Sequence, residues 1–131
     1  MEQRVKDLIE DCARASHAGT RQFAQIVAAL IEAGVEGYQA DYRARSTTYY
    51  LPSGEAHSVA LPAPAVAIPA QLDAGALQQA IRGSQRGEVR YPEFLTRSMD
   101  AGCVGYHVFF VGRHVAYFGR AGQQHIERFP D

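Results

Sequence analysis

Three kinds of side chain that could do chemistry recur at matched positions in the two halves of this chain, 68 residues apart. The six are Arg45, Tyr49, His57, Arg113, Tyr117 and His125. An imidazole with a tyrosine or an arginine beside it could act as a general base whose neighbour stabilises an anion. The same residues could serve packing alone, with tyrosine as a cross-strand residue and histidine as a hydrogen-bonded edge residue. We take the six as candidate binding residues, with no catalytic role assigned.

The other reactive residue types lack the spacing that their chemistry needs. Cys12 and Cys103 form no CxxC motif and occupy positions where a small apolar residue would fit, so we expect reduced, buried thiols. His107, His114 and His125 show neither HxH nor HExxH spacing. We therefore predict no metal site and no cofactor.

Composition limits the function classes further. The chain has 131 residues, 47% of them hydrophobic, and a formal net charge of −1, so it lacks the basic field that collects nucleic acid or anionic membranes. The N-terminus is charged from its second residue, and prolines interrupt the most apolar stretch, residues 59–70. These features predict a cytoplasmic protein with no membrane partner, for which nucleic acid is an improbable ligand.

The chain matches itself at an offset of 68. Residues 16–62 align with 84–130 without a gap and share eleven identities, against roughly three or four for unrelated sequences of ordinary composition. The matched pairs are Ser16/Ser84, Gly19/Gly87, Ala33/Ala101, Gly34/Gly102, Gly37/Gly105, Tyr38/Tyr106, Arg45/Arg113, Tyr49/Tyr117, Gly54/Gly122, His57/His125 and Pro62/Pro130. We interpret this as a diverged internal duplication.

The first copy is expected to begin with two amphipathic helices. Apolar residues at helical spacing cover 5–13 and 23–31, with Thr20 as the expected N-cap of the second helix. Gly34 stands where a helix would end in a left-handed residue.

In the second copy, Asp73 is the expected N-cap of the first helix, and Pro92 fits the first turn of the next. That helix should end at Gly102 in the same way as its counterpart.

After each helix pair the apolar period changes to two. It predicts strands at 38–43, 47–51 and 55–61, and again at 115–119 and 123–129. The expected fold is α+β. It consists of two helix-helix-three-strand repeats, 5–62 and 73–130, related by a pseudo-twofold axis, joined by a Pro/Ala connector over 62–72, and forming one domain with an antiparallel sheet. Residues 104–111 are apolar on both faces, so the second meander should be the more central one or should meet a partner chain.

The second copy also resembles a known family. The resemblance rests on Ile81, Gln85, Gly87, Tyr91, Pro92, Phe94, Ala101, Gly102, Gly105, Tyr106, Tyr117, Gly119, Gly122, Glu127, Phe129 and Pro130. The first copy matches more loosely, through Phe23, residues 33–38, Asp41, Tyr49 and Tyr50. These residues resemble the YbcV-like family of small bacterial and prophage proteins of unknown function, sometimes labelled phage envelope protein. The resemblance implies no catalytic residues.

We therefore expect a non-enzymatic binding or regulatory module of the bacterial cytosol, with a concave surface where the two meanders meet. One alternative is a small enzyme with a His/Tyr/Arg site at the repeat interface. Another is weak nucleic-acid binding through the strands at 42–50, where Tyr42, Tyr49 and Tyr50 would stack bases beside Arg43 and Arg45. The partner could be a small molecule or a protein, including a second copy of the chain. An apolar surface around Phe109 and Phe110 would favour a protein.

Overall fold

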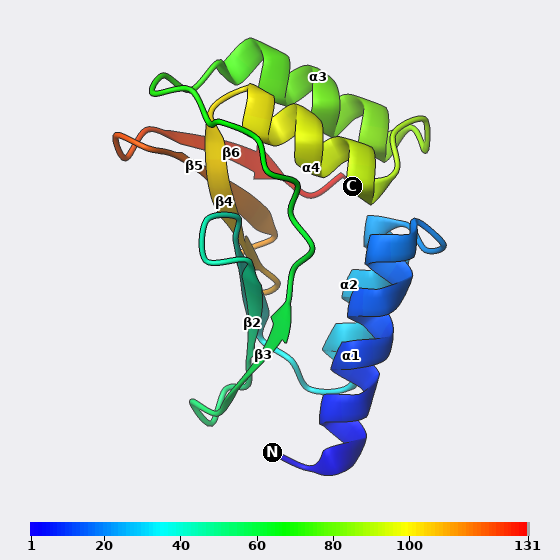
Figure 1. The fold of residues 1–131 in the computed structure, drawn as a ribbon. Coiled ribbons are helices and arrows are strands. Elements are labelled where there is room, and N and C mark those ends of the chain that lie inside the picture. The colour runs from blue at the N-terminus through cyan, green and yellow to red at the C-terminus, as the bar shows by residue number, and fades with distance from the viewer. Residues whose placement is uncertain (131) are drawn as a thin grey trace.

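The computed structural model describes residues 1–130 and shows an α+β fold, as the sequence predicts. Each half contributes two helices and then three strands (Figure 1). The first half holds α1 (Gln3–Ala18), α2 (Phe23–Glu32), β1 (Gly37–Asp41), β2 (Ser46–Tyr50) and β3 (Ala56–Ala60). The second holds α3 (Ala74–Gln85), α4 (Tyr91–Asp100), β4 (Cys103–Phe109), β5 (His114–Gly119) and β6 (Gln124–Arg128).

The six strands form one antiparallel sheet in the order β3-β2-β1-β4-β5-β6. In the central pair, Gly37 lies opposite Phe109, Asp41 lies opposite Gly105, and Gln39 lies opposite His107, the residue 68 positions later. The pairing of β1 with β4 therefore stays the same when each residue is replaced by its counterpart 68 positions away. A common origin of the two halves stays a prediction, which superposition of residues 16–62 on 84–130 would test.

The two meanders occupy equivalent places in this sheet. The prediction that the second meander is the more central one was wrong, because β1 and β4 share the middle and each half contributes one edge strand. The apolar residues at 104–111 do not all lie in the core. Val104, Val108 and Phe110 are buried, whereas Phe109 and Val111 are exposed.

The two faces of the sheet have different environments. Side chains that alternate along the strands, including Tyr38, Ala40, Tyr106 and Val108, belong to one continuous buried core together with apolar residues of all four helices. The opposite face carries half-buried and exposed residues such as Gln39, which the helices do not cover. A cavity built by the helices must therefore lie on the core face.

Two of the predicted helix starts are confirmed. The side chain of Asp73 accepts a hydrogen bond of 3.0 Å from the Ala76 N–H at the start of α3. Pro92 lies in the first turn of α4, where its missing N–H leaves no helical bond unmade. Within residues 1–130, no helix combines the length and the apolar character needed to cross a membrane.

The predicted N-cap at Thr20 was wrong. Gln22 caps α2 instead, in a reciprocal arrangement with Gln25. The hydroxyl of Thr20 donates to the Ala15 carbonyl of α1, at 3.2 Å. Because α1 continues to Ala18, the chain needs the following residues to reverse direction before α2 can begin.

Both predicted glycine helix ends are confirmed. Gly34 and Gly102 each have φ of +92°, which favours glycine because a Cβ atom is strained there. Behind α2, the Val35 N–H donates to the Leu30 carbonyl and the Gly34 N–H to the Ile31 carbonyl, which is the Schellman pattern.

Candidate functional site

The six candidate residues fall into two separate groups. Tyr49 pairs with His57 across β2 and β3, and Tyr117 pairs with His125 across β5 and β6. The expectation of one cluster near the pseudo-twofold axis was wrong, because both histidines lie on the edge strands of a six-stranded sheet. Whether either group binds anything stays a prediction.

The two matched arginines occupy equivalent hairpin turns. Arg45 and Arg113 have φ of +57° and +55°, the values of a left-handed turn residue. Their carbonyls accept hydrogen bonds of 2.9 Å from the N–H groups of Leu61 and Phe129. The backbone role of these positions accounts for the match between the two halves without any shared ligand.

His57 lies beside an acidic residue of α1. Its Nε2 atom is 3.7 Å from a carboxylate oxygen of Glu10 and, although buried, has no hydrogen-bond partner within residues 1–130. The histidine therefore lies where the edge strand β3 meets α1.

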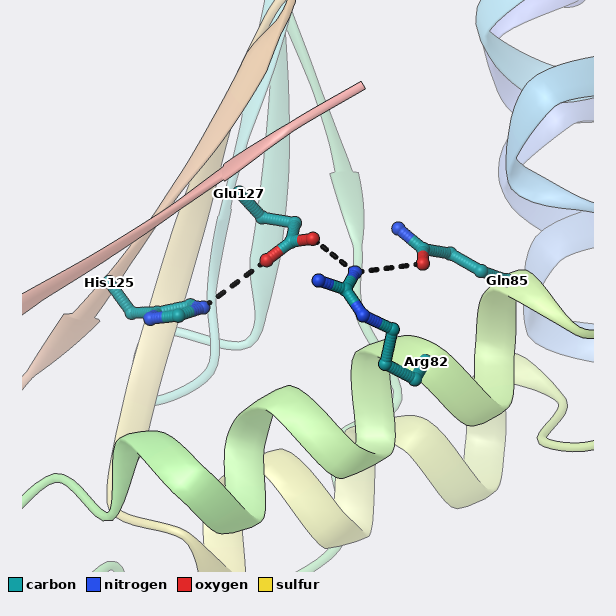
Figure 2. A network of polar contacts seen from close by, with 4 residues as sticks. All are labelled: Arg82, Gln85, His125 and Glu127. Atoms are coloured by element: carbon teal, nitrogen blue, oxygen red, sulfur yellow. Dashed lines mark hydrogen bonds and ion pairs between the residues drawn. The ribbon is translucent and has the colours of Figure 1, made fainter. Parts of the chain in front are cut away.

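His125 belongs to a polar network that ties β6 to α3 (Figure 2). Its Nε2 lies 3.3 Å from one carboxylate oxygen of Glu127, and Arg82 binds the other oxygen. The Arg82 side chain also donates to the Gln85 side-chain oxygen at 2.9 Å. The carboxylate of Glu127 is thus contacted from both sides.

A cavity of about 570 Å³ opens on the core face of the sheet, between the two helix pairs. Seven pairs of its lining residues lie 68 positions apart, so both halves build it from equivalent places. Three pairs are identical: Ser16 and Ser84, Gly19 and Gly87, Tyr38 and Tyr106. Of the six candidate residues, Tyr117 lines this cavity.

The loops between the helices meet at the mouth of the cavity in a reciprocal way. A Cβ atom on Gly19 would lie 2.9 Å from the Arg90 side chain, and a Cβ atom on Gly87 would lie 3.1 Å from the Gln22 side chain. Each loop thus presents a glycine to a long polar side chain of the other loop. This close approach brings residues of both loops to one opening.

The interior of the cavity is rich in tyrosine. The hydroxyls of Tyr91 and Tyr106 are hydrogen-bonded to each other at 2.9 Å. Burial raises the pKa of Tyr91 to about 12, and it raises the pKa values of Tyr38, Tyr106 and Tyr117 further above their ordinary value. These phenols are neutral at physiological pH, so they can donate and accept hydrogen bonds.

Sequence reasoning missed this site although the alignment contained its signal. Ser16/Ser84, Gly19/Gly87 and Tyr38/Tyr106 were among the eleven identities, but serine and glycine carry no chemistry that a motif would flag. Of the pairs selected for their polar chemistry, the arginines lie in turns and the histidines on edge strands, and Tyr117 alone lines the cavity.

The stacking surface predicted at residues 42–50 has lost two of its three tyrosines to the core, while Tyr50 is half-buried. Tyr42 and Tyr49 are 1% and 5% exposed, because residues 38, 40, 42 and 49 point into the core. The apolar surface predicted around Phe109 and Phe110 is also reduced, since Phe110 is buried.

The uncovered face of the sheet carries a row of stacked rings. His107 lies between Phe109, at a ring-centroid distance of 4.1 Å, and Tyr50, at 6.0 Å. His107 is half-buried there, and this burial lowers its pKa from the ordinary value of 6.5. Folding therefore opposes protonation of the imidazole.

The position of His107 predicts a pH dependence of stability. Below pH 6.5 the unfolded chain takes up this proton more readily than the folded chain does, so the free energy of unfolding should fall as the pH decreases. Urea denaturation at pH 7.5 and 5.5 should show a smaller fall for His107→Gln than for the wild type. Burial also lowers the pKa of His17, but this residue is present in both proteins and contributes to both falls. Equal falls in the two proteins would contradict the prediction.

The two cysteines lie in the hydrophobic core. Cys12 and Cys103 are free and buried, and burial raises the pKa of both thiols, which agrees with the predicted role as core residues. Within residues 1–130, no group of three His, Cys, Asp or Glu side chains is placed to hold a metal ion.

Comparison with known proteins identifies the family of the chain. No curated protein matches the chain. One family matches residues 13–127, which include all of the helices and strands except the first part of α1 and the last residue of β6. The chain therefore belongs to the family described as "Protein of unknown function (DUF1398)".

Proposed function

We propose that this protein is a non-enzymatic module that binds a small molecule in the cavity between its two helix pairs. The observation that supports this most directly is the cavity itself, since about 570 Å³ lies within the range of small-molecule sites. It combines apolar walls with a few convergent polar groups, which is the usual composition of such sites.

The chemistry of the lining favours binding over catalysis. A general base works best with a pKa near the working pH, whereas burial moves the pKa values of the lining tyrosines upward, away from neutrality. His125 does not line the cavity, and its Nε2 lies against Glu127. The bacterial or prophage origin, the cytoplasmic location and the YbcV-like label stay predictions from sequence.

Binding of a small probe to the wild type and to variants with a filled cavity tests the proposal. The probe is 4-methylphenol, a neutral ring with a hydroxyl that the tyrosines can bond. In ¹⁵N-resolved NMR titrations we expect saturable shifts at amides of residues 19–26 and 84–94. Ser84→Phe, which places a ring into the cavity, should weaken binding at least tenfold.

Two further variants control the experiment. Ser16→Phe fills the same space from the other helix pair and should give the same loss. Gln78→Phe adds the same ring to an exposed position of α3 outside the cavity and should bind the probe as the wild type does. The proposal fails if the wild type shows no saturable shifts, or if the filled variants bind normally while keeping a folded spectrum.

A further inference from the structure

Resting on the proposed function, we infer that the ligand carries an anionic head group, a carboxylate or a phosphate, which Arg21 and Arg90 bind at the mouth of the cavity. The rest of the ligand is an apolar or aromatic body with a polar group at its buried end. Charge, backbone placement and the tyrosine hydroxyls each support one part of this assignment.

The charged residues of the lining favour an anion. Arg21, Arg90 and Arg128 line the cavity and are exposed, which places them at its mouth. Glu127 is the one acidic residue of the described lining, and Arg82 and His125 already hold its carboxylate. The mouth therefore has an excess of positive charge, although the whole chain has a net charge of −1.

The two inferred head-group ligands come from equivalent loops. Arg21 precedes α2 and Arg90 precedes α4, and neither forms an ion pair within residues 1–130. The Arg90 stem packs over Gly19 of the opposite loop, which holds the side chain at the junction. Guanidinium groups bind carboxylate and phosphate in a planar, two-point geometry.

The first turns of α2 and α4 lie at the same opening. Phe23 and Tyr91, the first residues of these two ten-residue helices, both line the cavity. The positive ends of two helix dipoles thus add to the charge of the arginines.

The interior has hydrogen-bonding groups that the protein leaves unused. Tyr38 and Tyr117 are 6% and 7% exposed and line the cavity, yet neither hydroxyl has a hydrogen-bond partner within residues 1–130. Neither oxygen is a buried, unpaired atom of residues 1–130, so each keeps accessible surface where a ligand group can replace water as its partner. A polar group at the inner end of the ligand would pair them.

Matched probes separate this inference from the proposed function. We would measure NMR affinities for 3-(4-hydroxyphenyl)propanoate, its neutral amide, 3-phenylpropanoate and 4-hydroxyphenethyl phosphate. The acid should bind at least tenfold more tightly than the amide. It should also bind more tightly than 3-phenylpropanoate, which lacks the inner hydroxyl. The stronger of the carboxylate and the phosphate identifies the head group.

Charge-removing variants assign the effect to the two arginines. Arg21→Gln and Arg90→Gln should each weaken binding of the acid several-fold more than they weaken binding of the amide. Arg86→Gln removes a charge from the same loop as Arg90 at a residue outside the lining, so it should bind both probes as the wild type does. Equal affinity for acid and amide would overturn the anion assignment while the cavity remained a binding site. Failure of all the probes, 4-methylphenol included, would overturn the proposed function itself.

Discussion

We expect Gly102→Ala to lower the free energy of unfolding by about 2–4 kcal/mol, while Gly34→Ala at the equivalent position lowers it by about 1 kcal/mol. Both residues have φ of +92°, so both variants incur the same backbone strain. Their surroundings differ. A Cβ atom on Gly34 meets nothing within 4 Å, whereas one on Gly102 would lie 2.2 Å from the Gln71 carbonyl oxygen.

The neighbours of Gly102 have little freedom to move away. The contacted atoms belong to the backbone of Gln71 and Leu72, where the connector enters α3. The next residue, Asp73, donates its N–H to the Ala101 carbonyl at 2.7 Å and caps α3. Relief of the clash would therefore disturb the start of α3 as well as the end of α4.

Urea denaturation of the two variants measures the difference directly, because Gly34→Ala is a control for the left-handed conformation. Equal losses in the two variants would show that the connector yields to the new methyl group, and the explanation by close approach would then be wrong.

The second large effect is expected at a buried pair of hydroxyls that joins the two halves. Ser98 of α4 and Tyr42, which follows β1, are hydrogen-bonded at 2.9 Å, and Ser98 also donates to the Leu95 carbonyl at 3.0 Å. Tyr42 is 1% exposed and Ser98 is fully buried. Ser98→Ala should lower the free energy of unfolding by about 1–3 kcal/mol, since it leaves the Tyr42 hydroxyl without this partner and away from water.

A double-mutant cycle distinguishes this cause from lost packing. Tyr42→Phe removes the hydroxyl that Ser98→Ala strands, so the double variant should be more stable than the sum of the two single losses predicts. The measurement is the free energy of unfolding of all four proteins in urea. Simple additivity would mean that the two hydroxyls are not coupled.

Local signals in the sequence determined the elements of this fold. The change of apolar period from helical to alternating spacing predicted the helix pairs and the strands that follow them, because burial of one face imposes that spacing along the chain. Asp73, Gly34 and Gly102 were also readable, since caps and left-handed helix ends depend on a few consecutive residues. Thr20 was misread because the sequence did not show where α1 stops.

Only the tertiary structure decided which matched residues meet. Arg45 and Arg113 match because each occupies a left-handed turn. His57 and His125 also match, but they lie on β3 and β6, the two opposite edges of the sheet. The cavity exists because two loops far apart in the sequence approach across Gly19 and Gly87, with Arg90 and Gln22 packed over these glycines. Residue type and spacing describe neighbours along one chain segment. The approach of two segments depends on how the whole sheet and its helices pack, so the site could not be read from either copy alone.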